Sequence, residues 1–326
     1  DAIEPRLDSV SYLKTNRQQR HAAQQALHGV RDIERLVGRI AVGRANPKDL
    51  GALRDSLVSA PGIQEVLGNG KSPIAKKWKK ADLVKEVCSL LDRALVEAPP
   101  TAITDGGIFK LGYEEQLDQY IVDSTQGHEF LAELEARERE KTGIAKLKVR
   151  YNKVFGYFLE VSRANADKVP EHYLRKQTLV NAERFITEEL KQFETRVLGA
   201  DEKRKTEELK LYNELLETLA GDIHRLRQLA RLIGETDALM SLADVADECR
   251  WVRPEFCEDK KLSLTESRHP VVERLMPGGE RFIPNTIELD AETRRLMIVT
   301  GPNMGGKSTV MRQAAISVIL SQMGSF

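Results

Sequence analysis

Residues 209–233 read LKLYNELLETLAGDIHRLRQLARLI, and their apolar positions decide the fold of much of the chain. A seam with heptad spacing, held for more than three repeats, predicts a long helix that packs along another helix. The partner is either an earlier helix of the same chain, packed antiparallel, or a second chain. The seam positions alternate in steps of three and four: Leu209, Tyr212, Leu216, Leu219, Ile223, Leu226, Ala230 and Ile233.

A short β-rich segment interrupts the helical pattern on the N-terminal side of this seam. The pattern predicts helix over residues 113–141 and again over 186–248. Between them, alternating charged and apolar residues from 145 to 162 predict a β-hairpin with its turn near 151–154, and 176–180 reads as a further short strand. We therefore expect an arm in which one helix runs out, a small sheet caps its tip and a second helix returns.

The first 98 residues also carry a helical pattern. The apolar residues between 33 and 40 fall on one helix face. The dipeptide Asn46-Pro47 is expected to end that helix and start the next, with Asn46 as its cap. Breaks are expected at 60–62 and at 68–70, where Pro and Gly gather. The residues of the apolar face are Ile33, Leu36, Val37 and Ile40.

Residues 251–326 change to an α/β pattern that includes a glycine loop. Three short apolar runs, at 262–264, 286–289 and 295–300, are candidate strands. The last run leads directly into the loop, and 310–323 reads as the helix that follows it. Strand, glycine loop and helix in this order are the context that a phosphate-binding loop requires.

The loop reads TGPNMGGKST over residues 300–309 and fits the pattern G-x-x-x-x-G-K-[ST]. Its glycines let backbone N–H groups turn toward phosphate oxygens, while Lys307 can reach the β- and γ-phosphates and the Ser308 hydroxyl can bind Mg²⁺. The positive end of the next helix favours the same anion. The predicted nucleotide-binding residues of the loop are Gly301, Pro302, Asn303, Met304, Gly305, Gly306, Lys307, Ser308 and Thr309.

Composition limits where a polyanion could bind. The chain has 326 residues, enough for two or three domains, and its 50 Lys and Arg balance its 50 Asp and Glu. A nucleic-acid surface must therefore be a local patch. Three cysteines without metal-like spacing suit free thiols in a reducing cytosol. No apolar run approaches the length of a membrane span.

Such a patch falls in the β-rich segment. Residues 146–184 hold nine basic and four acidic side chains, and nine minus four gives a net charge of +5. Interleaved tyrosines suit phosphate contact, and without a base-reading helix the contact is expected to be with the backbone and independent of sequence. The candidate DNA contacts are Lys153, at the hairpin tip, and Arg175, Lys176, Gln177 and Thr178.

The amino-acid sequence of the glycine loop closely resembles that of the MutS mismatch-repair family, and further motifs extend the resemblance over essentially the whole chain. It implies a mainly α fold: a long-helix lever domain with a small inserted β-rich clamp, followed by the truncated start of a P-loop α/β ATPase domain. The further motifs are Asp105-Gly-Gly107, Gly112-Tyr113, Gly156-Tyr157, Gln177–Phe185, Arg268–Val272 and Phe282-Ile283-x-Asn285.

The resemblance also suggests boundaries and partners. Residues 1–126 and 188–250 would be the outgoing and returning lever helices, 127–187 the DNA clamp and 251–326 the incomplete ATPase domain. ATP and Mg²⁺ would be the cofactors. The partners would be double-stranded DNA, a second subunit in a homodimer and a MutL-type repair protein, without a membrane. The location would be the bacterial cytoplasm, at the nucleoid.

The resemblance assigns roles to single residues as well. Phe282 would stack on adenine, with Ile283 beside it. A structural turn is the expected role of His269, because Pro270 follows it. The whole protein would bind mismatched DNA and become a sliding clamp on ATP binding and hydrolysis.

We expect an internal segment of such a protein. Only 18 residues follow Ser308, and they contain neither a Walker B acid nor the signature loop that the second subunit supplies, so this chain alone is expected to be inactive as an ATPase. The Phe-x-Glu triplets at 158–160 and 256–258 are not taken as the mismatch-reading motif, because neither lies in an N-terminal domain. Two alternatives stay open: a MutS paralogue in recombination or ribosome rescue, and a structural coiled-coil interaction protein.

Overall fold

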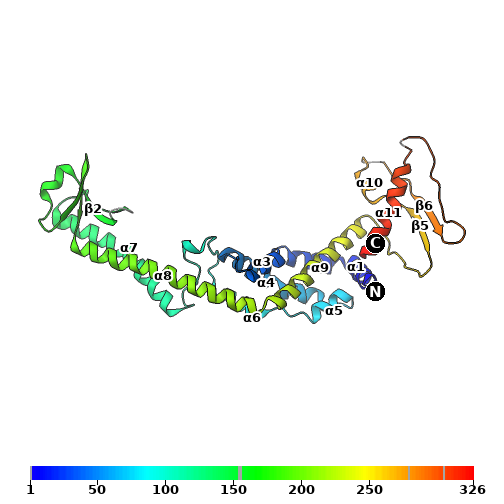
Figure 1. Ribbon diagram of the computed structural model, residues 1–326, viewed down its shortest axis with the longest axis horizontal. Helices are drawn as coiled ribbons and strands as arrows, with labels where there is room; N and C mark the ends of the chain where they lie inside the picture. The colour runs from blue at the N-terminus through cyan, green and yellow to red at the C-terminus, as the bar shows by residue number, and fades with distance from the viewer. Residues whose placement is uncertain (1, 153–155, 278–279, 304) are drawn as a thin grey trace. The chain divides into compact units, whose positions relative to one another are not determined.

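The computed structural model describes residues 2–152, 156–277, 280–303 and 305–326, without the side chains of 123–129 and 196–198. Over these residues the chain is mainly helical, as predicted, with a four-stranded antiparallel sheet and a separate antiparallel pair of strands (Figure 1). The chain forms two compact units, each assembled from segments that are distant in sequence.

One unit comprises residues 35–54 and 84–224. It holds most of α3 (Ile33–Ala41), the start of α4 (Pro47–Leu67), α6 (Lys85–Ala94), the short η1 (Ile103–Asp105), α7 (Glu115–Thr142) and α8 (Glu188–Gly221). Its sheet is built from β1 (Lys148–Asn152), β2 (Gly156–Ser162), β3 (Leu174–Thr178) and β4 (Ala182–Ile186), with η2 (Arg163–Lys168) between β2 and β3.

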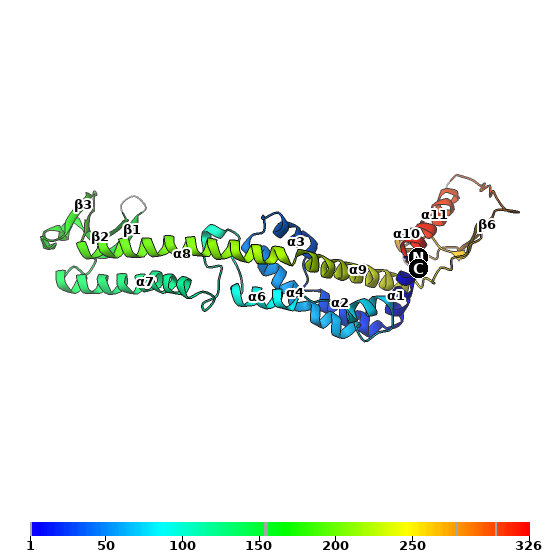
Figure 2. The same ribbon diagram turned by 60° about the horizontal axis from the view of Figure 1, so that its bottom comes forward.

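The helices α7 and α8 lie side by side, and the sheet follows at the end where the chain passes from one to the other (Figures 1 and 2). The predicted arm, with a helix running out, a small sheet and a helix returning, is confirmed within this unit. Both helices contact the sheet, α7 through β1 and α8 through β2.

The predicted heptad seam is confirmed only in part. The helix is not continuous, because α8 ends at Gly221 and α9 (Ile223–Glu248) begins two residues later. Tyr212 and Leu219 are fully buried, whereas Leu209 is 46% exposed. Leu211 and Leu215, off the heptad positions, are buried instead. The broader apolar stripe is typical of a helix packed in a globular unit, and it speaks against a simple coiled-coil protein.

The sheet has the strand order β1-β2-β4-β3, and all neighbours are antiparallel. The predicted hairpin is confirmed by the β1–β2 register, although its turn at 153–155 lies outside the described residues. The strand predicted at 176–180 is found slightly earlier, as β3. Strand β4 escaped prediction because one of its two inward-facing residues is Glu183, which breaks the usual alternation of apolar and polar residues.

The core of the sheet is closed by residues of α7, α8 and the strands themselves. Leu134 comes from α7, Leu159 and Phe185 from the strands, and Leu190 and Phe193 from α8. Phe130 stacks on Phe193, with ring centroids 4.4 Å apart. Together these residues fix the sheet against the helix pair. The other buried members of this core are Ile144, Leu147, Val161 and Tyr173.

The other unit comprises residues 1–34, 55–83 and 225–326. It holds α1 (Ile3–Thr15), α2 (Arg17–Leu27), the second part of α4, α5 (Pro73–Lys79), most of α9, α10 (Pro270–Leu275) and α11 (Lys307–Met323). The strands predicted at 262–264 and 286–289 are confirmed as the antiparallel pair β5 (Lys261–Ser267) and β6 (Asn285–Asp290).

Helix α4 corrects one prediction and confirms another. Asn46 caps it as expected, with its Oδ1 accepting from the Asp49 N–H at 2.8 Å. The break expected at 60–62 is wrong, because the helix runs through Pro61 to Leu67. Proline removes a helical hydrogen bond, but the full burial of Ala60, Ile63 and Leu67 on the same helix outweighs that loss.

The strand predicted at 295–300 is also wrong. These residues have no regular secondary structure, and Leu296 and Ile298 are 80% and 78% exposed. A strand needs a neighbour that pairs with its backbone N–H and C=O groups, and among the described residues none lies beside this run. The described strands pair elsewhere: β5 pairs with β6, and β1 to β4 form the four-stranded sheet.

The described helices give no candidate for a membrane span, since none of them is both long enough and apolar enough.

Candidate functional site

The glycine loop leads directly into α11. Gly306 has φ of +81° and caps the helix in the left-handed region, which glycine adopts without steric cost. A Cβ on Gly305 would lie 3.0 Å from the Pro302 carbonyl oxygen, so a larger residue there would crowd the loop backbone. Met304, one of the predicted contacts, lies outside the described residues.

The first turn of α11 presents backbone donors. Its first helical hydrogen bond runs from the Val310 N–H to the Gly306 carbonyl, at 3.0 Å. The N–H groups of residues 307–309 therefore have no acceptor within the helix. Together with the helix dipole, these donors favour an anion at this end of a 17-residue helix.

Lys307 closes the loop in this structure. Its Nζ donates to the carbonyl oxygens of Gly301 at 2.5 Å and Pro302 at 2.8 Å. A phosphate group seated in the loop would offer the same ammonium a charged acceptor, and charge-assisted hydrogen bonds are the stronger kind. Ser308 is exposed beside it. The backbone N–H donors, the loop glycines and the Lys307 ammonium are therefore suited to bind a polyphosphate.

The two residues expected at the adenine lie on the irregular segment before β6. Phe282 is partly buried, and Ile283 is 81% exposed. Asn285 ties this segment to α11: its Nδ2 donates to the Ile283 carbonyl oxygen at 3.2 Å and to Gln313 Oε1 at 3.5 Å. The predicted base and phosphate contacts are therefore linked through α11.

A magnesium ion would find few protein ligands. Among the described residues, no group of three or more His, Cys, Asp or Glu side chains is placed to hold a metal ion. Mg²⁺ commonly takes only one or two protein ligands and completes its shell with water and substrate phosphates. The Ser308 hydroxyl fits that pattern.

His269 has the structural role that its neighbour Pro270 predicts. It is 5% exposed and caps α10, with Nδ1 accepting from the N–H groups of Val271 and Val272 at 3.3 Å each. The adjacent Arg268 was not singled out by sequence reasoning. Its guanidinium donates to Glu273 at 2.5 Å and to the Cys249 carbonyl at 2.9 Å, which joins the end of α9 to α10.

Two of the predicted DNA contacts on β3 also contact other residues of the sheet. Arg175 pairs with the buried Glu183 at 3.0 Å, and its guanidinium lies 5.9 Å from the Phe185 ring centre. The Gln177 Oε1 accepts from Arg184 at 2.8 Å. These two side chains are thus partly engaged within the sheet.

Two further predicted contacts lie on the same strand. Lys176 is exposed at a bulge between Arg175 and Gln177, and Thr178 is exposed at the end of the strand. Lys153 lies outside the described residues.

Several other basic residues of the sheet are also paired internally. Arg150 and Arg184 both contact Glu160, at 3.3 and 3.5 Å, and the Arg184 guanidinium lies 4.4 Å from the Phe158 ring centre. Within the described residues, no ion pair engages four further basic side chains, all of them exposed. They are Lys146, Lys148, Arg163 and Lys168. None of them was among the DNA contacts chosen from the sequence.

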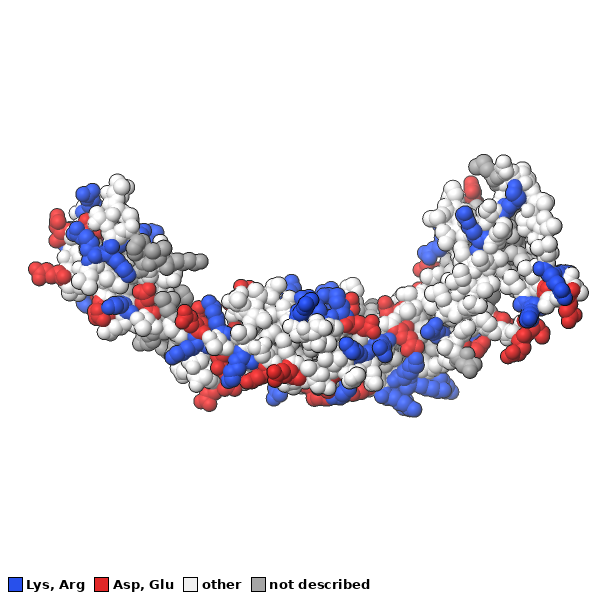
Figure 3. Space-filling model, in the orientation of Figure 1, with Lys and Arg blue, Asp and Glu red and all other residues white. Residues whose placement is uncertain are grey.

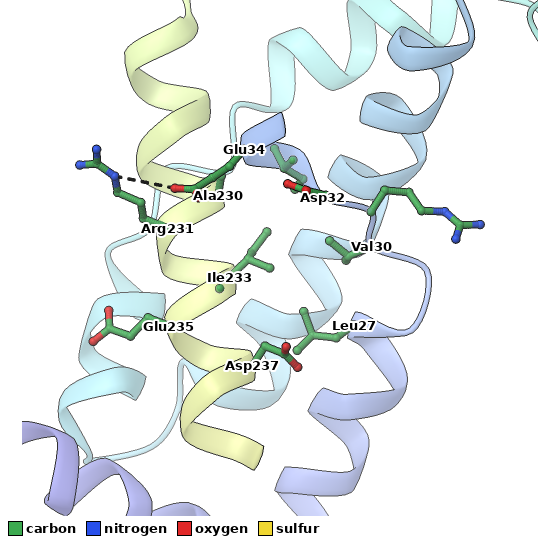
Figure 4. Close-up of a pocket in the computed structure, with 12 residues that line it drawn as sticks. Leu27, Val30, Asp32, Glu34, Ala230, Arg231, Ile233, Glu235 and Asp237 are labelled. Atoms are coloured by element: carbon green, nitrogen blue, oxygen red, sulfur yellow. Dashed lines mark ion pairs between the residues drawn. The ribbon is translucent and has the colours of Figure 1, made fainter. Parts of the chain in front are cut away.

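A pocket of about 540 Å³ lies elsewhere, between α9 and the segment from the end of α2 to the start of α3. Figure 4 shows apolar side chains such as Leu27 and Ile233 facing into it, and the Glu34–Arg231 ion pair at its rim. Its charged residues are of both signs, and none of the predicted site residues lines it. No pattern in the sequence singled it out.

Comparisons with known proteins agree with the motifs. The model of MutS family domain IV matches residues 112–203, and that of MutS domain V matches residues 297–326. The DNA mismatch repair protein MutS of Myxococcus xanthus is 45% identical over 326 residues, covering 99% of this chain and 36% of the relative.

Two further relatives give the same result. The DNA mismatch repair protein MutS of Staphylococcus carnosus is 44% identical, over 100% of this chain and 38% of the relative. The DNA mismatch repair protein MutS of Geobacillus thermodenitrificans is 47% identical, over 100% of this chain and 36% of the relative. The chain therefore spans a little more than a third of the length of these relatives.

Proposed function

This chain belongs to the MutS family, as a segment of a bacterial member, and we propose that it grips duplex DNA during mismatch repair. The relatives carry the name DNA mismatch repair protein. Mismatch recognition and conversion into an ATP-dependent sliding clamp are proposed for the whole protein. This chain would supply the lever, the clamp and the first part of the ATPase domain.

The proposed domains follow the sequence boundaries. Residues 1–126 would form the core and outgoing lever helices, 127–187 the clamp, 188–250 the returning lever helices and 251–326 the beginning of the ATPase domain. A second subunit, as a homodimer, and a MutL-type protein are the proposed protein partners of the whole molecule.

The exposed basic side chains on the four-stranded sheet are the observation that carries the DNA-binding proposal. Lys148 is exposed at the start of β1, Lys146 is exposed two residues before it, and Lys176 is exposed on β3. Lysine offers a compact charge without base-reading geometry, which suits the phosphate backbone rather than a particular sequence. Arg175, Gln177 and Thr178 would add contacts from the same strand.

The glycine loop is the proposed ATP site. Residues 301–309 would hold the phosphates through backbone N–H groups and Lys307, Phe282 and Ile283 would position the adenine, and Ser308 would bind Mg²⁺. When bound, ATP supplies the phosphoanhydride bond whose cleavage the whole protein would use. The part played by this chain is binding and orientation, with Asn285 holding the base-contacting segment against α11.

A salt titration tests the DNA-binding proposal. A fluorescent duplex is bound to the 326-residue chain, and its anisotropy is followed between about 50 and 200 mM salt. Log affinity should fall linearly with log salt, by about 0.9 for every phosphate contact. The double variant Lys146→Gln/Lys148→Gln should therefore reduce the slope by about 1.8.

The matched control is Lys260→Gln/Lys261→Gln, an adjacent exposed lysine pair that follows Glu258 and Asp259. It removes the same charge from the chain and should leave the slope unchanged. Equal slopes for the parent chain and the β1 variant would contradict the proposed clamp contacts.

A further inference from the structure

A second basic surface lies on and before α5. Residues 66–81, all of them described, contain five lysines and no acidic residue, so five minus zero gives +5 over 16 residues. The β-rich segment needs 39 residues, 146–184, to reach the same net charge. Figure 3 shows Lys and Arg side chains gathered where α5 lies. The lysines are Lys71, Lys76, Lys77, Lys79 and Lys80.

The helix holds these lysines outward. Ser72 caps α5, with its Oγ accepting from the Ala75 N–H at 3.3 Å. Trp78 is fully buried, and its Nε1 donates to Thr236 Oγ1 at 2.8 Å. Ile74 is buried on the same side. Since residues three and four apart share a helix face, Lys76, Lys79 and Lys80 lie together on the opposite one.

Within the part of the chain that the structure describes, acidic partners balance little of this charge. Only Lys77 is ion-paired, with both carboxylate oxygens of Glu235 at 2.6 and 2.7 Å. Within the described residues, no hydrogen bond or ion pair engages the ammonium groups of the other four. We call these four, Lys71, Lys76, Lys79 and Lys80, the α5 lysine face.

The local fold accounts for only part of this cluster. Lysines near a helix C-terminus interact favourably with its dipole, and this applies to Lys76, Lys77 and Lys79 in the last turn of α5 and to Lys80 at its end. It does not account for Lys71, which precedes the helix, and like charges at spacings of three and four repel one another. An external anion would relieve that repulsion.

We propose that the α5 lysine face is a second surface for the phosphate backbone of duplex DNA, separate from the four-stranded sheet. The identity of this polyanion rests on the proposed DNA-binding function. Among residues 66–81 no large apolar side chain is exposed and no arginine occurs. Protein partners usually dock on aromatic and arginine anchors, whereas a uniform row of lysines suits a uniformly charged chain.

The test compares two adjacent lysine pairs in the 326-residue chain. Lys79→Gln/Lys80→Gln removes two charges from the α5 lysine face, and Lys260→Gln/Lys261→Gln removes two from an acidic setting. Both are titrated with the same labelled homoduplex at several salt concentrations. The α5 variant should lose about 1.8 from the slope of log affinity against log salt, and the control should lose nothing. Far-UV circular dichroism checks that both variants are folded.

A photo-crosslinking amino acid at position 76 gives a second readout, which should attach to the duplex in the otherwise unchanged chain. Unchanged slope in the α5 variant together with no crosslink would overturn the proposal. Tighter binding to polyglutamate than to DNA at equal charge, lost in the α5 variant, would also overturn it and point to an acidic protein instead.

The sheet variant Lys146→Gln/Lys148→Gln separates this proposal from the proposed function. If that variant lowers the slope, while the α5 variant leaves it unchanged and position 76 gives no crosslink, the clamp stands and the α5 surface is wrong. If only the α5 variant lowers the slope, the clamp contacts are wrong. If the parent chain binds no DNA, both proposals are wrong.

Discussion

At the scale of single residues, Asp247 joins the end of α9 to α2. Its carboxylate contacts the Arg17 guanidinium at 2.5 Å and that of Arg20 at 3.0 Å. Hydrogen bonds from Arg17 first, and from Arg20 second, lower the pKa of Asp247 from 3.8 to about 2. Since Arg20 is itself only 4% exposed, this ion pair lies in a closely packed part of the unit.

This shift predicts an acid-sensitive contribution to folding. A carboxyl group whose pKa is lower in the folded state stabilises it above the unfolded pKa, and the stabilisation is lost as the pH falls through the folded value. Asp247→Asn should therefore lower the melting temperature at neutral pH, and its difference from the parent chain should shrink between pH 3.8 and about 2. Melting curves by circular dichroism across this range measure it.

The control is Asp237→Asn, an exposed aspartate on the same helix. It should leave the melting temperature nearly unchanged throughout. A difference between Asp247→Asn and the parent chain that stays constant down to the lowest pH would show that the ion pair does not carry the effect.

Residue chemistry also limited the choice of DNA contacts from sequence. Composition located the basic segment, but it could not show that Arg175 forms an ion pair with the buried Glu183 or that the Arg184 guanidinium lies over the Phe158 ring. Such pairs depend on strand register, which brings Thr178 opposite Glu183 and Gln177 opposite Arg184. Charge counts therefore find the surface, and register decides which charges remain available on it.

At the scale of elements, Pro61 is an unusual member of α4. It is exposed in the interior of a helix of 21 residues, where proline costs one hydrogen bond and strains the preceding turn. Pro61→Ala should restore that bond. The gain is offset in part because proline also restricts the unfolded chain, which leaves a net stabilisation of about 2 kcal/mol.

Urea unfolding followed by circular dichroism measures this change as a higher midpoint with an unchanged slope. Gly62→Ala, one residue further along the same helix, is the matched comparison, because an added Cβ there meets only the Ala26 side chain, at 3.9 Å. A lower midpoint for Pro61→Ala would mean that the proline fits the helix without strain.

Elements with a strong local signal could be predicted from the sequence, and elements that depend on distant partners could not. The hairpin, α7, α8 and α11 follow from periodicity and glycine placement. The strand expected at 295–300 has the right apolar composition, yet the described chain gives it no neighbour to pair with. Helix α4 continues through Pro61 because buried residues on both sides hold it, and that packing is invisible in a local window.

At the scale of the whole molecule, the chain crosses between its two units several times. Residues 35–54 and 84–224 form one unit, and residues 1–34, 55–83 and 225–326 form the other. Periodicity cannot show this division, because it arises from contacts between residues far apart in sequence. The sequence boundaries drawn from motifs follow the order of the chain, whereas packing groups its segments differently.

Nucleotide binding should be visible as a change in the stability of the unit that contains the loop. A ligand present at 100 times its dissociation constant stabilises the folded state by about 2.7 kcal/mol. ATP should therefore raise the melting temperature of the parent chain, and Lys307→Ala should abolish that rise because it removes the cation from the loop. Differential scanning fluorimetry with and without ATP measures it.

Ser308→Ala is the informative partner variant. It should keep the rise that ATP alone produces and lose the additional rise on adding Mg²⁺. An equal rise in Lys307→Ala and the parent chain would contradict the proposed phosphate site, and it would leave the DNA-binding proposals untouched.

The core beneath the four-stranded sheet closes within one continuous stretch of chain. All of its buried members lie between Leu134 and Phe193, and the partly buried residues packed against them extend this stretch only to Phe130. Such a stretch can be transferred as one piece, because only two connections, through α7 and through α8, join it to the rest of the chain. Grafted between other antiparallel helices of matching spacing, it would carry the proposed DNA-contacting surface to a new scaffold.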